Sequence, residues 1–265
     1  MKTPPHTKRE HLRQLVKGKN EWSEPLSPED KARGFRGWHE RGYLPNCDKP
    51  GLVQFITFRL WDSMPAARKG EWEHLLAAAE RSDAPRSGEP DDAPRDGARS
   101  NFASLDDKTR AQARREASRA QRIKLEDYLD RSLGECFLRD PRVAALMENS
   151  MRFHHGARYE LLAWVVMPNH VHALIQVGDT SLSEIIQNWK SIVAVKANKL
   201  LGRTGNFWQL DYWDTFMRDR EQKIKAVRYI ENNPVKSGFC RVPETWPFGS
   251  ARFRDPQTRE LKLPK

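Results

Sequence analysis

Two apolar runs separated by only two residues constrain the fold more than any other feature of the sequence. The first run, RYELLAWVVM, ends at Met167, and the second, HVHALIQV, begins at His170. Between them stands the pair Pro168-Asn169, which is typical of tight turns. The pattern therefore predicts two antiparallel strands joined as a hairpin.

Further elements surround this hairpin. The run GLVQFITFRL (residues 51–60) has the β-branched and aromatic composition of a buried strand, and NFWQLDYWDTFM resembles a short aromatic strand. Helices are expected at EWEHLLAAAE, at DPRVAALMENSMRF, in the amphipathic run after Ser181 and in DREQKIKAVRYIENN. The order β-α-β-β-α-β-α predicts an α+β fold of the split β-α-β type, an antiparallel sheet backed by helices.

Local patterns set the expected ends and buried faces of the last two helices. Ser181 and Glu184 fit a capping box, and Gly202 is the expected end of that helix. Asp219 is the expected cap of the final helix and Pro234 its stop. The expected buried stripes are Ile185, Ile186, Trp189, Ile192, Val193 and Leu200 in the first helix, and Ile224, Val227 and Ile230 in the second.

Composition divides the chain into one domain with appendages. Residues 1–45 are basic, polar and interrupted by Pro and Gly, and are expected to form a flexible arm without helix or strand. Residues 46–253 form the expected domain, with a disordered and helical insertion at 81–122 and a tail at 254–265.

Charge points to an anionic partner. Lys and Arg number 46 against 36 Asp and Glu, a net charge of +10, which favours nucleic acid. Three scattered cysteines indicate neither a disulfide framework nor a cysteine-based zinc site. No apolar run reaches the ~20 residues of a membrane span, so a cytoplasmic protein without membrane contact is expected.

The histidine pair in the hairpin is a candidate metal site. Side chains at i and i+2 of a strand share one face, so His170 and His172 converge and could hold one divalent cation. An isolated H-x-H is also compatible with two packed strand histidines. His154 and His155 are interpreted as structural or surface residues.

The final helix carries a phenol and an amide on one face. Tyr229 and Asn233 are four residues apart and therefore lie one above the other, at the edge of the apolar stripe. The phenol could reach a neighbouring sheet, or could be an ordinary tyrosine at the edge of the core. Asn233 could equally be only a helix terminus.

Read together, four blocks resemble a known family. AWVVMPNHVHALI, SLSEIIQNWKS, FWQLDYWD and VRYIENNPVKSGF with WPFGSAR occur in order at sensible spacing. They resemble the REP-associated tyrosine transposases of the single-tyrosine HUH transposase superfamily, over roughly residues 50–253.

The resemblance implies a ferredoxin-like domain that binds single-stranded or hairpin DNA. It implies Tyr229 as the nucleophile that forms a 5′-phosphotyrosine, with Mg²⁺ or Mn²⁺ held by His170, His172 and Asn233. Relatives outside this subfamily carry Gln at the position of Asn233. No nucleotide cofactor is expected, a monomer is expected rather than a dimer, and the protein is expected to associate with the nucleoid.

DNA contacts are expected at cations and aromatics near these elements. Lys190, Arg218 and Lys236 are candidate phosphate contacts, although Lys190 could also be a solvated helix lysine. Trp208 could stack on bases or fill the core, as could Phe207 and Tyr212.

Two further functions of the protein remain open. One is a domesticated hairpin-binding protein with weak or no catalysis, and the other is a metallohydrolase that uses water.

Overall fold

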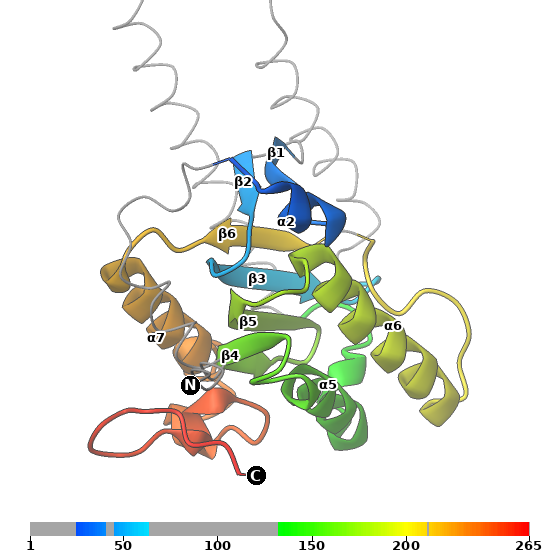
Figure 1. The fold of residues 1–265 in the computed structure, drawn as a ribbon. Helices are drawn as coiled ribbons and strands as arrows, with labels where there is room; N and C mark the ends of the chain where they lie inside the picture. The colour runs from blue at the N-terminus through cyan, green and yellow to red at the C-terminus, as the bar shows by residue number, and fades with distance from the viewer. Residues whose placement is uncertain (1–24, 41–44, 64–131, 211, 265) are drawn as a thin grey trace, which may run out of the picture.

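The computed structural model describes residues 25–40, 45–63, 132–210 and 212–264. Its centre is a four-stranded antiparallel sheet with the strand order β4-β5-β3-β6. Helix α5 leads into the first strand of the β4-β5 hairpin, and α6 connects that hairpin to β6 (Figure 1). This is the expected ferredoxin-like arrangement, built from β3 (Val53–Arg59), α5 (Pro141–Phe153), β4 (Tyr159–Val166), β5 (His170–Val177), α6 (Leu182–Leu200) and β6 (Trp213–Phe216).

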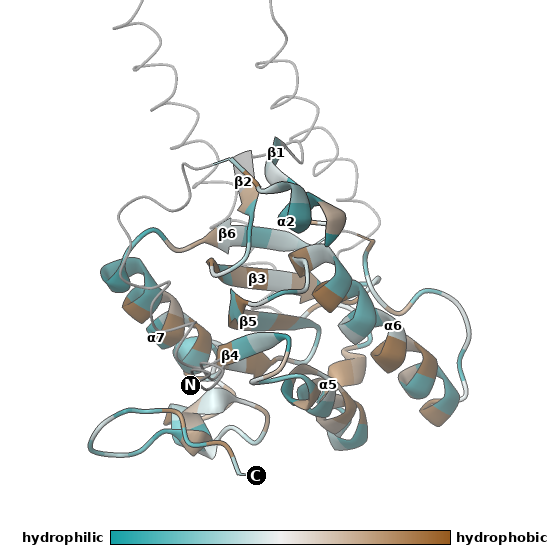
Figure 2. Ribbon diagram, viewed as in Figure 1, coloured by the Kyte–Doolittle hydropathy of each residue, from teal (hydrophilic) through white to brown (hydrophobic). Residues whose placement is uncertain are grey.

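The sheet separates two apolar cores, because strand residues alternate between its faces. Val171, Ala173 and Ile175 of β5 belong to the larger core, which α5 and α6 cover. Leu174 belongs to a smaller core that includes Ala226 and Ile230 of helix α7 (Arg220–Lys236). Figure 1 shows α7 on one side of the sheet and α6 on the other, and Figure 2 shows hydrophobic residues recurring along α5 and α6.

Helix α7 differs from expectation at its end and on its buried face. Asp219 caps it as predicted, since its carboxylate accepts from the main-chain N–H of Gln222 at 2.7 Å. Pro234 was expected to stop the helix, but it lies inside, and α7 continues to Lys236. Proline lacks the N–H that would bond to the carbonyl of Ile230, but the N–H of Ser237 still donates to the carbonyl of Asn233 at 3.0 Å, so the last turn is kept. Ile224, expected in the buried stripe, is 40% exposed.

Helix α6 also departs from its predicted details. Ser181 is the N-cap residue, but its side chain makes no capping bond, and its hydroxyl lies 3.3 Å from that of Ser183. The capping box with Glu184 is therefore wrong. Ile192 and Leu200, expected to be buried, are 45% and 40% exposed. The buried stripe runs instead through Ile186, Trp189, Val193 and Ala197, and Ile192 is rotated by ~100° from Val193. Gly202 follows the helix end with a φ of +62°.

Part of the predicted N-terminal arm is folded. Residues 25–48 include a short helix, α2 (Pro28–Ala32), and a two-stranded ribbon of β1 (Gly37–Glu40) and β2 (Pro45–Asp48). Phe35 is 4% exposed and belongs to the larger core. The prediction of an arm without helix or strand is wrong here. The segment lacks a sustained apolar period, but Phe35 enters the core and β1 pairs with the nearby strand β2.

The C-terminal segment closes the outer edge of the sheet. Gly249 forms a bridge with Val165 of β4, and the N–H of Val166 donates to the carbonyl of Phe248 at 2.8 Å. Two short 3-10 turns, Pro243–Thr245 and Ser250–Phe253, shape this segment. Leu261 and Leu263 pack against the larger core, so residues 254–264 are part of the domain and not a separate tail.

Other predicted features lie outside the described residues. These are residues 1–24 of the arm, the helix at 71–80 and the insertion at 81–122. Among the helices that the structure describes, none combines the length and the apolar character needed to cross a membrane.

Candidate functional site

The two histidines lie side by side at the start of β5, as the strand periodicity predicts. In the sheet register His170 is opposite Arg59 and His172 is opposite Thr57 of β3. Both side chains are fully buried, and their ring centroids are 4.7 Å apart. They face the side of the sheet that α7 covers.

A hydrogen bond to Nδ1 orients each ring. Nδ1 of His170 donates to Oδ1 of Asn169 at 2.8 Å, and the Asn169 amide donates to the carbonyl of Leu133 at 3.1 Å. Nδ1 of His172 lies 2.8 Å from Oγ1 of Thr57, which can accept its proton. In these tautomers each Nε2 keeps its lone pair, which is the arrangement that orients metal-binding imidazoles. Nε2 of His170 is buried and has no hydrogen-bond partner in the described part of the chain.

Both imidazoles are neutral at physiological pH. Burial, and to a smaller extent the charge of Lys236, lower the pKa of His172 to about 3. The pKa of His170 is well below its ordinary value, first because of burial and then because of the charges of His172 and Arg59. Neutral imidazole is the form that coordinates metal ions.

Helix α7 brings the phenol to this pair. The ring of Tyr229 lies 5.4 Å from that of His172 and 5.9 Å from that of Phe55, centroid to centroid. Asn233 lies one turn further along the same face and is 1% exposed, with its side-chain oxygen buried. The structure therefore places Tyr229 beside the histidine pair and Asn233 on the same buried face of the helix.

The donors present fit a divalent cation. The site contains two imidazole nitrogens and one amide oxygen, which are ligand types that divalent cations accept, and water can complete the shell of such an open site. Across residues 25–40, 45–63, 132–210 and 212–264, no group of three or more His, Cys, Asp or Glu side chains could hold a metal ion. Asn233, on the same face of α7 as Tyr229, carries a buried amide oxygen and is the candidate third ligand.

The cations predicted to bind DNA have different surroundings. Lys236 is exposed at the end of α7, and its charge acts on His172. Arg218 is exposed just before α7, with its guanidinium 5.5 Å from the ring centroid of Phe216. Lys190 instead donates to the carbonyls of Gln209 and Leu210, at 2.6 and 2.7 Å.

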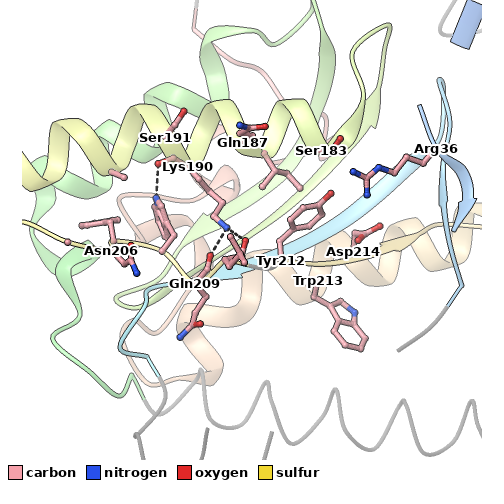
Figure 3. Close-up of a pocket in the computed structure, with 16 residues that line it drawn as sticks. Arg36, Ser183, Gln187, Lys190, Ser191, Asn206, Gln209, Tyr212, Trp213 and Asp214 are labelled. Atoms are coloured by element: carbon pink, nitrogen blue, oxygen red, sulfur yellow. Dashed lines mark hydrogen bonds between the residues drawn. The ribbon is translucent and has the colours of Figure 1, made fainter. Parts of the chain in front are cut away.

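Lys190 and Trp208 line a cavity of about 790 Å³ between α6 and the segment that leads into β6 (Figure 3). Trp208 is 7% exposed, and its indole N–H donates to the carbonyl of Lys190 at 3.0 Å. Trp208 and Phe207 belong to the larger core, on the α6 side of the sheet. The structure thus favours the core role that the sequence left open for both aromatics, and it separates Lys190 from Tyr229.

Two orienting residues were not among the sequence-based candidates. Asn169 immediately precedes His170, so its place in the turn was a usable signal. Thr57 is 115 residues away from His172, and only the strand register brings the two together. His154 and His155 have structural roles, as expected: His154 follows the end of α5, and Nδ1 of His155 accepts from the N–H of Leu161 at 2.9 Å.

Comparisons with known proteins find one matching family and a small number of similar proteins. Residues 141–233 match the family described as "Transposase IS200 like". A putative REP-associated tyrosine transposase of Haemophilus influenzae is 27% identical over 103 residues, which cover 35% of this chain and 58% of that protein. The REP-associated tyrosine transposase of Escherichia coli (strain K12) is 31% identical over 96 residues, which cover 35% of this chain and 54% of that protein.

The chain thus spans just over half the length of the relatives that it matches. A solved structure of a REP-associated tyrosine transposase bound to a REP hairpin has a TM-score of 0.41 and 15% identity, over 87% of this chain and 92% of that one. The matched region runs from α5 to Asn233 in α7 and contains both histidines and the tyrosine. The resemblance indicated by the sequence is confirmed as a similarity: residues 141–233 match the IS200-like transposase family, and the chain is similar to the REP-associated tyrosine transposases.

Proposed function

We propose that this protein is a DNA strand transferase that cleaves and rejoins single-stranded, hairpin-forming DNA through a covalent bond to Tyr229. The observation that carries the proposal is the position of Tyr229 beside two buried, neutral histidines. The similarity to REP-associated tyrosine transposases supports it. Hairpins of the REP type are the proposed substrate.

The reaction exchanges one phosphodiester for another. The Tyr229 hydroxyl loses its proton to solvent, its oxygen forms a bond to phosphorus, and the bond from phosphorus to the 3′ oxygen breaks. The released 3′ oxygen takes up a proton, and the 5′ phosphate stays on the tyrosine. The reverse reaction with another 3′ hydroxyl rejoins the strands without ATP.

His170, His172 and Asn233 would hold a divalent cation, Mg²⁺ or Mn²⁺, in this proposal. When bound, such an ion acts as a Lewis acid toward a phosphate oxygen. The protein's own contribution is to present two imidazoles in one orientation, fixed through Asn169 and Thr57, in a buried position.

Positive charge near the site supports a nucleic acid substrate. Arg59 and Lys236 are close enough to lower the pKa values of the two histidines, and Arg218 is exposed just before the helix that carries Tyr229. Such cations contact phosphates without reading sequence. The net charge of +10 adds a general attraction to DNA.

The test is incubation of the purified protein with end-labelled hairpin oligonucleotides and Mn²⁺ or Mg²⁺, followed by a denaturing gel. We expect a labelled adduct that requires the ion and is absent in Tyr229→Phe and His170→Ala. Tyr212→Phe is the matched control, since this half-buried tyrosine packs against the opposite core. Binding without cleavage across a panel of hairpins would favour the domesticated binding protein, and cleavage without an adduct would favour water attack.

A further inference from the structure

Helix α7 carries a buried carboxylate that the proposed reaction does not use. The side chain of Glu231 is 4% exposed. Its Oε1 accepts from the hydroxyl of Ser250 and from Nε of Arg254, both at 2.7 Å, and its Oε2 lies 3.8 Å from Nη2 of Arg259. All three partners come from the C-terminal segment, so the carboxylate joins α7 to that segment.

Ser250 and Arg254, the two closest partners of Glu231, also form hydrogen bonds with strand β4. The main-chain N–H of Trp164 donates to the Ser250 hydroxyl oxygen at 3.1 Å. Nη2 of Arg254 donates to the carbonyl of Leu162 at 2.7 Å, where the β4-β5 register shifts between Leu161 and Ala163. Strand β4 leads through the hairpin turn to His170 at the start of β5. Glu231 therefore links α7, which carries Tyr229, to the β4-β5 hairpin, which carries both histidines.

Helical geometry places Glu231 and Tyr229 on opposite flanks of α7. Ile230 between them is fully buried against the sheet. Successive residues are rotated by ~100°, so Tyr229 and Glu231 project to either side of Ile230. Tyr229 contacts the ring of His172 on one flank, and Glu231 contacts Ser250 and Arg254 on the other.

Because Tyr229 and Glu231 belong to the same helix, contacts that fix the position of Glu231 also fix the rotation of α7 and thus the position of Tyr229. A rotation of ~20° about the axis would move a side-chain tip by ~2 Å, given the ~10–12 Å diameter of a helix. A displacement of ~1 Å at a reacting group can slow a reaction by ~100-fold. A buried ion pair is in general a weak source of stability but can define a unique arrangement.

We propose that Glu231, Ser250 and Arg254 form a positioning device that sets the rotation of α7 and so aligns Tyr229 with the histidine pair. This inference rests on the proposed function. The three residues do not touch the reacting atoms. They act through the helix, which also carries Asn233 on the flank of Tyr229.

Glu148 provides a matched control for Glu231. It is a buried carboxylate that also pairs with the C-terminal segment, through Arg252, and it accepts from the indole N–H of Trp164 at 2.8 Å. It belongs to α5, on the other face of the sheet. Glu148→Gln therefore weakens the attachment of the same segment without touching α7, whereas Glu231→Gln weakens the link to α7 itself.

The experiment measures single-turnover adduct formation at saturating hairpin DNA, the Kd for the same hairpin, and amide hydrogen exchange in α7 without DNA. For Glu231→Gln we expect adduct formation to slow by ~10–100-fold, the Kd to change by less than ~3-fold, and exchange across residues 226–236 to accelerate. Ser250→Ala, which keeps the Arg254 contact, should give a smaller effect of the same kind. Glu148→Gln should leave the adduct rate and the exchange of α7 close to those of the unmodified protein.

Equal losses in Glu231→Gln and Glu148→Gln would overturn the inference, because they would show a general loosening of the C-terminal segment. A change confined to the Kd would also overturn it. If the unmodified protein forms no adduct, the proposed function fails, and exchange then decides the positioning role on its own. Faster exchange of α7 in Glu231→Gln alone would support the role, and equal exchange in both variants would contradict it.

Discussion

The two faces of the sheet differ in composition. Under α5 and α6 the face is continuous apolar core, with Trp164 and Trp189 among its largest fully or almost fully buried side chains. Under α7 the apolar core is smaller, and it is interrupted by the polar side chains of His170, His172 and Asn233. We infer from this difference that one face mainly stabilises the fold and that the other carries the proposed reaction, and the predictions below test that division.

Truncation of a side chain in the larger core, on the face covered by α5 and α6, should give the largest loss in the free energy of unfolding. Trp189 packs against Tyr159 and Phe58 and donates its indole N–H to the Tyr159 hydroxyl at 2.8 Å. Trp189→Ala should lower the free energy of unfolding by about 4 kcal/mol, measured by urea denaturation. Ile230→Ala on the α7 face should cost about 2–3 kcal/mol. A larger cost for Ile230→Ala would contradict the division.

Acid should destabilise the α7 face through its buried histidines. Unfolded histidines bind protons below pH ~6.5, whereas folded His172 does so only near pH 3. The unfolded state therefore holds more protons in this window, and stability must fall as the pH falls. We expect a loss on the order of 1–2 kcal/mol per histidine between pH 7 and pH 5, measured by denaturation in the presence of a chelator. His172→Gln should reduce this slope, and an unchanged slope would show that the histidine is not buried and neutral.

Loss of the hydroxyl that orients His172 should weaken metal binding more than folding. Thr57→Val keeps the side-chain shape but removes the partner of Nδ1. We expect the Kd for Mn²⁺ to rise by ~10-fold, in calorimetric titration, with a stability change below ~1 kcal/mol. Thr215→Val on β6 is the matched control, since Thr215 pairs with Phe55 in the sheet and not with a histidine. Equal Mn²⁺ affinity in both variants would rule out the orienting role.

Two lysines on opposite sides of the sheet should give different phenotypes. Lys190→Met removes the donor to the carbonyls of Gln209 and Leu210 and should cost about 1–2 kcal/mol of stability, with little change in DNA affinity. Lys236→Met should weaken DNA binding and reduce its salt slope by about one. Fluorescence anisotropy at several salt concentrations measures this, and the reverse pattern would contradict the division of roles.

The strongest periodic segments were predictable from the sequence. The β4-β5 hairpin, β3, α5 and the shared face of His170 and His172 follow from strand and helix periods. These features depend on residues close together in the chain. The family resemblance supplied the roles of the histidines and the tyrosine, which periodicity alone left open.

The contacts around the candidate site that the sequence did not indicate join residues far apart in the chain. The hydrogen bond from His172 to Thr57 spans 115 positions, and the Glu231 contacts come from a segment with little regular structure. The ribbon of β1 and β2 was missed because its strands are short and polar. Pro234 inside α7 was missed because proline usually ends a helix.

The most direct test of the central claim is to identify the residue that becomes linked to DNA. The chain has five tyrosines, so proteolysis of the adduct and mass spectrometry of the nucleotide-bearing peptide distinguish among them. The proposed mechanism predicts a 5′-phosphate on Tyr229 alone. Attachment at another tyrosine, or cleaved hairpin DNA with no linked peptide, would contradict it.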